Sequence, residues 1–366
     1  MARPKPPETL GARLRQQAVY HAVRAGLSLP QVAGLETSVR VTAPIARAYG
    51  GSRMRRHKVN RIIERLAVAM PELSHAQRHE LVMASYEHLA TLGTEFLLSP
   101  RLMSEDGWAN NVTIDPICEY MKALMSSGPV ILVTGHCGNW EVLGYSLGMM
   151  GFPISAIYRP FDLAPLDRWA REVRMRRGLN LIDKFEAMRK LPQILGDGGM
   201  VAIVADQNAG DRGVQVPFFN RLASTYKLIG LMAMEFNAPI IIGQAVRRPR
   251  GEGAGGAGGM GFRIEMQDAI RPEDWADQPH PLYYITARYR LGIERMIRRA
   301  PEQYLWMHRI WKSRPRHERM DQPFPPALRG KLASLPWMDE AQLENLVHRS
   351  DLDRAWLREH KTDRFT

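Results

Sequence analysis

The sequence predicts an α/β fold in which helices flank a central, largely parallel sheet, with an N-terminal helical region ahead of it. Two observations predict this class. From residue 129 onward, short apolar β-branched runs alternate with helix-length amphipathic segments, the pattern of strands joined by crossover helices. Residues 1 to about 100 show helical periodicity instead. The 366 residues suffice for one large domain or one domain with smaller additions.

Helices are expected over residues 55–70 and 76–98. The first places Val59, Ile62, Ile63, Leu66 and Met70 on one face, and the second repeats the pattern through Leu81, Val82, Leu89, Leu92 and Phe96. Ahead of them, LGARLRQQAVYHAVRAGLSLP has a weakly apolar stripe flanked by Arg13, Arg15 and Arg24. This stretch is interpreted either as a helix that packs on the domain or as one that lies in a membrane interface.

Strands are expected at 129–135, 152–158, 200–206, 239–248 and 262–270, and helices from 139, over 186–198, 225–237 and 283–301. The glycine-rich segment 250–261 is expected to be a loop between two neighbouring strands. We therefore predict an N-terminal helical region over 1–110, an α/β domain over 111–316 and a C-terminal extension over 317–366. The extension is rich in charge and proline, which is typical of an appendage.

Composition limits the partners. Fifty Lys and Arg against 38 Asp and Glu give a net charge of +12, which suits nucleic acid, an anionic membrane or an acidic carrier protein. Two cysteines, Cys118 and Cys137, have no disulfide or metal spacing and indicate a reducing compartment. Neither a signal peptide nor a convincing transmembrane helix is visible, so any membrane contact is expected to be peripheral.

The motif HCGNWE places His136 and Glu141 where a buried strand gives way to a helix. Asn139 is a good N-cap residue, which would put Glu141 in the first helical turn. Across a glycine-containing turn, that carboxylate could fold back and bind one nitrogen of the imidazole, leaving the other to take a proton as a general base. The alternative is a capped helix with a histidine tucked into the turn.

Four ordered blocks resemble one family. HCGNWE, YRPFDLAPLDRW, GDGGMVAIVADQNAGDRGVQVPFFNRLAST and PEQYLWMHRIWKSRP are similar to blocks of the bacterial lipid A biosynthesis acyltransferases, the lauroyl and myristoyl transferases, within the His-x4-Asp/Glu glycerolipid-type acyltransferases. The resemblance spans roughly residues 45 to 316. It implies a glycerolipid acyltransferase-like fold, and transfer of an acyl chain from acyl carrier protein, or coenzyme A, to a hydroxyl of a lipid A precursor, without a cofactor, metal or covalent enzyme intermediate.

The resemblance also implies roles for particular residues. His136 would be the base, oriented by Glu141; Arg159 would stabilise the oxyanion, and Asp206 would support the dyad or hold an acceptor hydroxyl. Arg159 could instead be a surface arginine, and Asp206 a turn cap. The residues expected to bind substrate are Asn139, Trp140, Arg174, Arg177, Gln207, Phe218, Phe219 and Thr225. For the Phe pair the alternative is core packing, and for the arginines a solvated helix face.

Other features leave alternatives open. Trp306, His308, Trp311 and Lys312 could face a membrane interface or pack internally. The chain lacks the family's clear apolar anchor helix, and Asn220 stands where the family has glycine. We expect a peripheral protein on the cytoplasmic face of the inner membrane, with an anionic glycolipid acceptor. The acceptor could be another glycolipid, such as a phosphatidylinositol mannoside. A non-catalytic relative that binds lipid or nucleic acid is the remaining alternative, but the chain has no nucleic-acid-binding motif.

Overall fold

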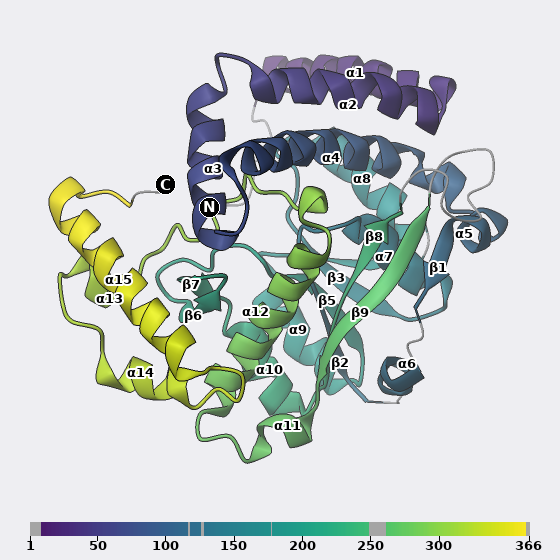
Figure 1. Ribbon diagram of the computed structural model, residues 1–366. Helices are drawn as coiled ribbons and strands as arrows, with labels where there is room; N and C mark the ends of the chain where they lie inside the picture. Colours follow the sequence, from purple (N-terminus) through teal and green to yellow (C-terminus); the bar gives the residue numbers. More distant parts are fainter. Residues whose placement is uncertain (1–8, 116–117, 126–127, 177, 249–260, 364–366) are drawn as a thin grey trace.

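The computed structural model describes residues 9–115, 118–125, 128–176, 178–248 and 261–363. Its centre is a seven-stranded sheet in the order β1-β9-β8-β2-β5-β3-β4, and a separate hairpin pairs β6 with β7 (Figure 1). Neighbouring strands of the sheet are parallel except β8 and β9, so the predicted α/β class with a largely parallel sheet is confirmed. The strands are β1 (Val112–Ile114), β2 (Val130–Thr134), β3 (Ile154–Tyr158), β4 (Asn180–Asp183), β5 (Met200–Val204), β6 (Val214–Phe218), β7 (Arg221–Thr225), β8 (Ile240–Arg247) and β9 (Phe262–Ile270).

Helices lie on both faces of the sheet and above its carboxyl edge. Up to β5 they are α1 (Leu10–Ala33), α2 (Leu35–Gly51), α3 (Arg56–Ala69), α4 (His75–Leu102), α5 (Glu105–Asn111), α6 (Cys118–Leu124), α7 (Trp140–Met149), α8 (Ala164–Met175) and α9 (Ala187–Gly196). Beyond β5 they are α10 (Leu228–Phe236), α11 (Pro272–Ala276), α12 (Pro281–Arg299), the 3-10 turn η1 (Pro301–Gln303), α13 (Arg316–Arg319), α14 (Pro326–Ala333) and α15 (Glu340–His360).

The strand β2 shows how the sheet is buried. All five of its residues are buried because alternate side chains enter two different cores. Ile131 and Val133 pack in the core that contains α9, α10 and α12. Val130 and Leu132 pack in the core on the opposite face, beneath α7. Burial on both faces explains why this strand appears in the sequence as a continuous apolar run.

The predicted N-terminal helices form, with one exception in their packing. The expected apolar face of α3 is buried through Leu66 and Met70. On α4, Leu81, Val82 and Leu92 are buried, but Leu89 is exposed. A capping box at Ser74 fixes the start of α4, because its hydroxyl accepts a hydrogen bond from the Gln77 N–H while the Gln77 side chain accepts one from the Ser74 N–H.

The segment that contains the glycine-rich loop joins β8 to β9, which are antiparallel neighbours, as predicted. The loop itself, at positions 250–260, lies outside the described residues, as does Arg177. Among the described residues, no helix has both the length and the hydropathy needed to cross a bilayer.

The C-terminal residues are more integrated than the sequence predicts. Leu332, Leu335, Leu343 and Leu346 belong to the same core cluster as the sheet residue Ile131. In Figure 1, α15 runs along the side of the molecule next to the β6–β7 hairpin. The predicted C-terminal extension therefore packs on the domain through leucines of α14, of α15 and of the turn between them. The prolines that suggested an appendage, such as Pro323, Pro325 and Pro336, lie between the helices.

Candidate active site

Two neighbouring parallel strands bring His136 and Asp206 together. Thr134 at the end of β2 is in register with Val204 at the end of β5. His136 is the second residue after the end of β2, and Asp206 is the second residue after the end of β5. Their side chains meet at the carboxyl edge of the sheet, with 2.7 Å between His136 Nδ1 and Asp206 Oδ1. This is the edge where open α/β sheets bind their ligands.

Asp206 is held by more than the histidine. It is fully buried, and its second oxygen, Oδ2, accepts a hydrogen bond of 3.1 Å from the Tyr304 hydroxyl. The guanidinium of Arg290, also fully buried, donates to the carbonyl of the preceding Ala205. The carboxylate therefore has a fixed orientation relative to the imidazole.

The charges of this pair follow from its surroundings. Burial alone would lower the pKa of His136, but the charge and hydrogen bond of Asp206, together with the charge of Glu141, raise it above its ordinary value. For Asp206, burial works in the opposite direction, yet the neighbouring His136 holds the pKa of the carboxyl well below its usual range. Asp206 is thus ionised at neutral pH and makes His136 a stronger base.

Glu141 has a different partner from the one expected. It lies in the first turn of α7, where the Asn139 side chain caps the helix by accepting a hydrogen bond from the Val142 N–H. Its carboxylate forms a bidentate ion pair with Arg174 of α8, with 2.5 Å between Oε1 and Nη2. The hydrogen bond to His136 Nδ1 comes from Asp206 instead, because the sheet register brings Asp206 to the ring whereas the helix directs Glu141 towards α8.

A buried polar network supports the loop between β2 and α7. Asn139 Nδ2 donates to Glu95 of α4 at 2.8 Å, and Glu95 accepts two hydrogen bonds from Arg247 at the end of β8. Gly138 has φ +58°, and a Cβ there would lie 2.2 Å from the Ala245 carbonyl oxygen. Only glycine fits this close approach. Asn139 therefore positions the loop from inside the protein.

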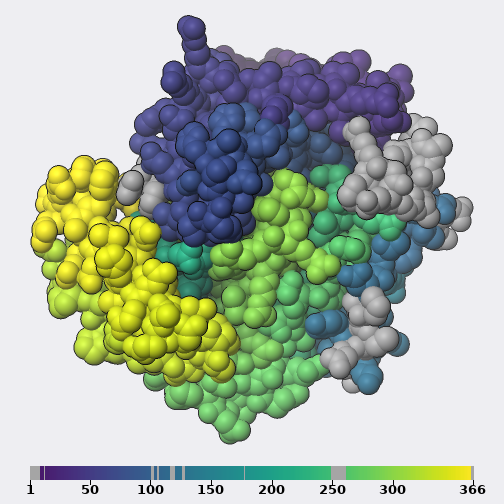
Figure 2. All heavy atoms as spheres, viewed as in Figure 1, coloured from purple at the N-terminus to yellow at the C-terminus, as the bar shows by residue number. Residues whose placement is uncertain are grey.

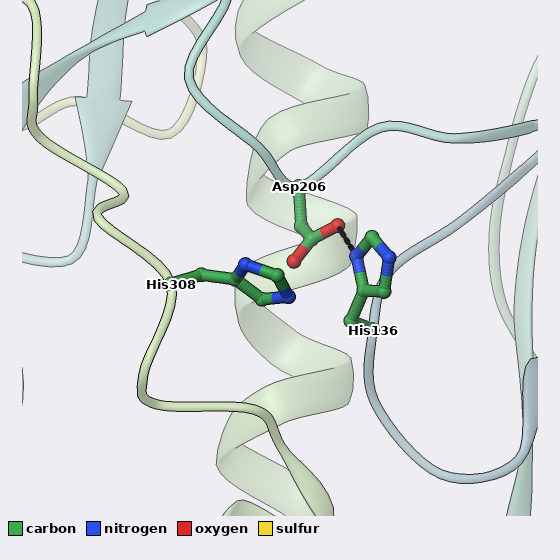
Figure 3. Close-up of side chains that lie close together, drawn as sticks. All are labelled: His136, Asp206 and His308. Atoms are coloured by element: carbon green, nitrogen blue, oxygen red, sulfur yellow. Dashed lines mark hydrogen bonds and ion pairs between the residues drawn. The ribbon is translucent and has the colours of Figure 1, made fainter. Parts of the chain in front are cut away.

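His308 completes the cluster around the pair. Figure 3 shows Asp206 between the two imidazoles, and the ring centroids of His136 and His308 are 4.6 Å apart. Burial and the neighbouring His136 lower the pKa of His308 to about 4, so it is neutral at pH 7. Its Nε2 is buried and has no hydrogen-bond partner among the described residues. The three side chains could also hold a divalent ion such as Zn²⁺, since their ligand atoms lie within 4.8 Å of one another.

Two cavities lie at the carboxyl edge of the sheet on either side of this cluster. One, of about 390 Å³, is lined by the strand-end residues Tyr158 and Asp183 and by Arg168 and Arg171 of α8. The other, of about 1040 Å³, lies beneath α2 and is lined by Glu95 and Arg247, among others. The first cavity is lined by the two arginine guanidinium groups and by the carboxyl groups of Asp167, Glu172 and Asp183.

The other predicted catalytic and polar residues are placed as follows. Arg159 follows β3 at the same edge as His136, and its side chain is 52% exposed, with Asp162 3.7 Å away. Trp140 contacts the His136 ring edge-on, with the centroids 4.8 Å apart. Gln207 follows Asp206 directly and is partly buried. The guanidinium of Arg174 is ion-paired with the carboxylate of Glu141.

The phenylalanines and the threonine predicted to bind substrate are buried inside the protein. Phe218 and Phe219 are buried, with Arg290 over the Phe218 ring at 3.7 Å. Thr225 is fully buried and donates to the Ala223 carbonyl. Trp306 and Trp311 are also buried, so of the two interpretations given for them the structure supports internal packing.

Sequence reasoning missed several supporting residues, although some signals were present. Tyr304 and His308 lie in the PEQYLWMHRIWKSRP block. His308 was considered there only as an interface or packing residue, and Tyr304 was given no role. Arg290 is one of many arginines in a basic helix, and nothing in its spacing distinguishes it. Glu95 lies on an amphipathic helix, 44 residues from its partner Asn139, and only the folded structure brings them together.

The fold and site together define a class: an α/β protein with a histidine–carboxylate pair at the carboxyl edge of a parallel sheet, equipped for general-base chemistry. Comparison with known proteins identifies the family. The model of the bacterial lipid A biosynthesis acyltransferases matches residues 13–313. The chain belongs to this family, and it is an O-acyltransferase.

Individual relatives agree with the family. The chain is 24% identical to the lipid A biosynthesis lauroyltransferase of Escherichia coli K12 over 257 residues, which cover 68% of this chain and 78% of that protein. It is 29% identical to the lipid A biosynthesis palmitoleoyltransferase of the same organism over 197 residues, or 53% of this chain and 59% of the relative. A lipid A biosynthesis acyltransferase of Shigella flexneri matches to the same extent.

Proposed function

We propose that the protein transfers a fatty acyl chain from the thioester of acyl carrier protein to a hydroxyl of a lipid A precursor, with His136 as general base and Asp206 as the residue that orients it. One observation carries this assignment of roles: the 2.7 Å contact between His136 Nδ1 and a fully buried, ionised carboxylate. With Nδ1–H donating to Asp206, the lone pair of the ring is on Nε2, which is then free to accept a proton.

The reaction follows from this arrangement. His136 Nε2 removes the proton of the acceptor hydroxyl as the oxygen attacks the thioester carbonyl carbon, and the negative charge passes to the carbonyl oxygen. Collapse of this intermediate breaks the carbon–sulfur bond, and the proton on His136 can neutralise the departing thiolate. Asp206 stabilises the imidazolium between these two steps. We assign Arg159, which follows β3 at the same edge, to the oxyanion.

The substrate sites are assigned by their chemistry. Of the charged groups that line the smaller cavity, Arg168 and Arg171 are the ones that would bind a phosphate of an anionic glycolipid. Trp140 and Gln207 lie next to the His136–Asp206 pair and would contact the reacting groups. The ion pair of Glu141 with Arg174 connects α7 to α8. The net charge of +12 suits an acidic carrier protein as donor. We place the reaction at the cytoplasmic face of the inner membrane.

Replacement of His136 tests the proposal. His136→Ala should lower the transfer of a labelled acyl chain from acyl carrier protein to the lipid A precursor on the order of 10²- to 10⁴-fold, since general-base catalysis contributes about that much. His348→Ala, an exposed histidine on α15, is the matched control and should retain full activity. Full activity of a folded His136→Ala protein would refute the mechanism. A panel of other glycolipids tests the acceptor in the same assay.

A further inference from the structure

The positive charge of the chain is concentrated in its first two helices, the turn after them and the start of α3. Residues 9–58 contain nine Lys and Arg but one acidic residue, Glu36, a net charge of +8 out of +12 for the whole chain. The same segment holds many of the exposed large apolar side chains of the described residues. In Figure 1 and Figure 2, α1 and α2 form one end of the molecule, above α4.

The helix α1 presents an apolar stripe to solvent. Spacings of three and four residues place the following exposed residues along one side of the helix: Leu10, Leu14, Ala18, His21, Ala25, Leu29 and Val32. Leu14 is 62% exposed, Leu29 69% and Val32 88%. Exposed Arg13 and Arg15 flank the stripe on its two sides. An apolar stripe bordered by arginines on the outside of a protein requires an explanation, because folding does not bury it.

The other side of α1 is occupied by protein. Gln16, Tyr20, Val23 and Leu27 lie on that side and are partly buried, and the helix contacts α2, α4 and α8 there. The guanidinium of Arg24 lies 5.0 Å from the Trp169 ring of α8. The stripe therefore points directly away from the body of the protein. A partner can cover it without moving the helix.

The neighbouring helix α2 repeats the arrangement. Val41, Ile45 and Tyr49 are exposed on α2, and Met54 is exposed just after it. Leu35 and Val39 of the same helix are buried and line the cavity of about 1040 Å³ at the carboxyl edge of the sheet. The outward apolar surface of α1 and α2 thus lies over the end of the molecule that carries the His136–Asp206 pair.

We propose that the outer face of α1 and α2, defined by Leu14, Leu29, Val32, Val41 and Ile45, binds an anionic lipid bilayer, with the helices lying flat in the interface and the arginines at the level of the headgroups. Aliphatic stripes bordered by arginines are the pattern of interfacial helices. A second copy of the chain would bring the arginines of two such faces together. An acidic carrier protein would pair with the arginines but leave the aliphatic stripe without a partner.

This inference rests on the proposed function in one respect: membrane binding would bring the active site to a lipid acceptor. Vesicle binding itself does not depend on that function, because it is measured without substrates. The full chain is mixed with vesicles of phosphatidylethanolamine and phosphatidylglycerol, or of phosphatidylcholine alone, and the bound fraction is measured by flotation. Binding should favour the anionic vesicles and weaken as salt is raised.

The triple variant Leu14→Glu, Leu29→Glu, Val32→Glu should weaken vesicle binding at least about tenfold, because charges replace apolar groups that enter the interface. The matched control, Met188→Glu, Met320→Glu, Leu352→Glu, changes charge and exposed apolar residues equally, but elsewhere on the surface, and should bind nearly as well as the wild type. All the replaced residues are exposed, so both variants should keep the wild-type melting temperature.

Undiminished vesicle binding by the Leu14, Leu29, Val32 variant would overturn the inference, as would equal losses in both triple variants. Capture of acyl carrier protein that depends on this stripe, without vesicle binding, would also overturn it, as would a dimer in solution that the stripe variant dissociates. A chain that binds anionic vesicles through the stripe but transfers no acyl group supports the inference and refutes the proposed function, so the two failures are distinguishable.

Discussion

At the scale of single residues, the histidine has two candidate carboxylates, and its pKa distinguishes them. Asp206 contacts His136 Nδ1, while Glu141 acts on it only through its charge. The sequence pointed to Glu141 because it lies in the same motif. Asp206 lies 70 residues away, and its position at a strand end was visible, but not the register of β2 and β5 that brings it to the ring. Proximity in sequence was a poorer guide than proximity along one edge of a sheet.

A pH profile tests this distinction. Because the base must be unprotonated and its pKa is raised, kcat/KM for transfer should fall on the acid side with an apparent pKa above 6.5, the ordinary histidine value. Asp206→Asn removes the main source of that rise, so the acid limb should move to lower pH while the rate on the plateau drops about 10²-fold or more. Glu141→Gln should move the limb in the same direction by less.

The reverse order would contradict the assignment: a larger shift in Glu141→Gln than in Asp206→Asn would return the orienting role to Glu141. Both substitutions remove one negative charge with little change of volume, so each serves as the control for the other. Melting temperatures would show whether any loss of rate reflects unfolding instead.

At the scale of elements, the longer strands of the central sheet could be predicted, and the shorter ones could not. β2, β3, β5, β8 and β9 all lie within their predicted segments. β2, β3, β5 and β8 are rich in apolar residues, and in β2 this reflects burial on both faces. β9, which is nine residues long, begins with alternating apolar and polar residues. β4 has four residues and carries Asn180 and Asp183, so it has no comparable pattern. The β6–β7 hairpin lies in one of the blocks that carry the family resemblance, and no strands were predicted there from the sequence.

Buried hydrogen bonds connect Glu95 of α4 to the loop that carries His136 and Asn139, and they give a prediction at the scale of elements. Glu95→Ala would leave Arg247 without its bidentate partner and Asn139 without its acceptor. Removal of one member of a buried pair typically costs about 3–5 kcal/mol of unfolding free energy, and kcat should fall as the loop that carries His136 loosens. Chemical denaturation and the transfer assay measure the two effects.

Glu87→Ala is the matched control, since Glu87 lies on the same helix but pairs with the partly exposed Arg47. Its effect on the free energy of unfolding should stay below about 1 kcal/mol. Equal, small effects of both substitutions would mean that the buried network does not support the loop.

At the scale of the whole molecule, buried charges join the C-terminal helices to the sheet side of the protein. Asp353 of α15 accepts hydrogen bonds from Arg221 of β7 at 2.5 Å and from Arg314 at 3.0 Å, and all three side chains are buried. Arg314 also pairs with Glu318, whose pKa burial raises to about 7. Such pairing over more than 130 residues has no local sequence signature, which is why the tail appeared separable.

Asp353→Ala tests whether the C-terminal helices α13 to α15 fold together with the rest of the protein. The change leaves two buried guanidinium groups without a shared carboxylate and should cost about 3–5 kcal/mol of unfolding free energy. Because α15 shares its core with the sheet, circular dichroism and tryptophan fluorescence should report one common transition, shifted to lower denaturant. Asp351→Ala, which removes only a surface pair with Arg354, should shift it little. If Asp353→Ala instead produced an early transition of its own and left a second one at the wild-type midpoint, the C-terminal helices would fold independently, and the charges that tie them to β7 would have no part in holding the catalytic edge in place.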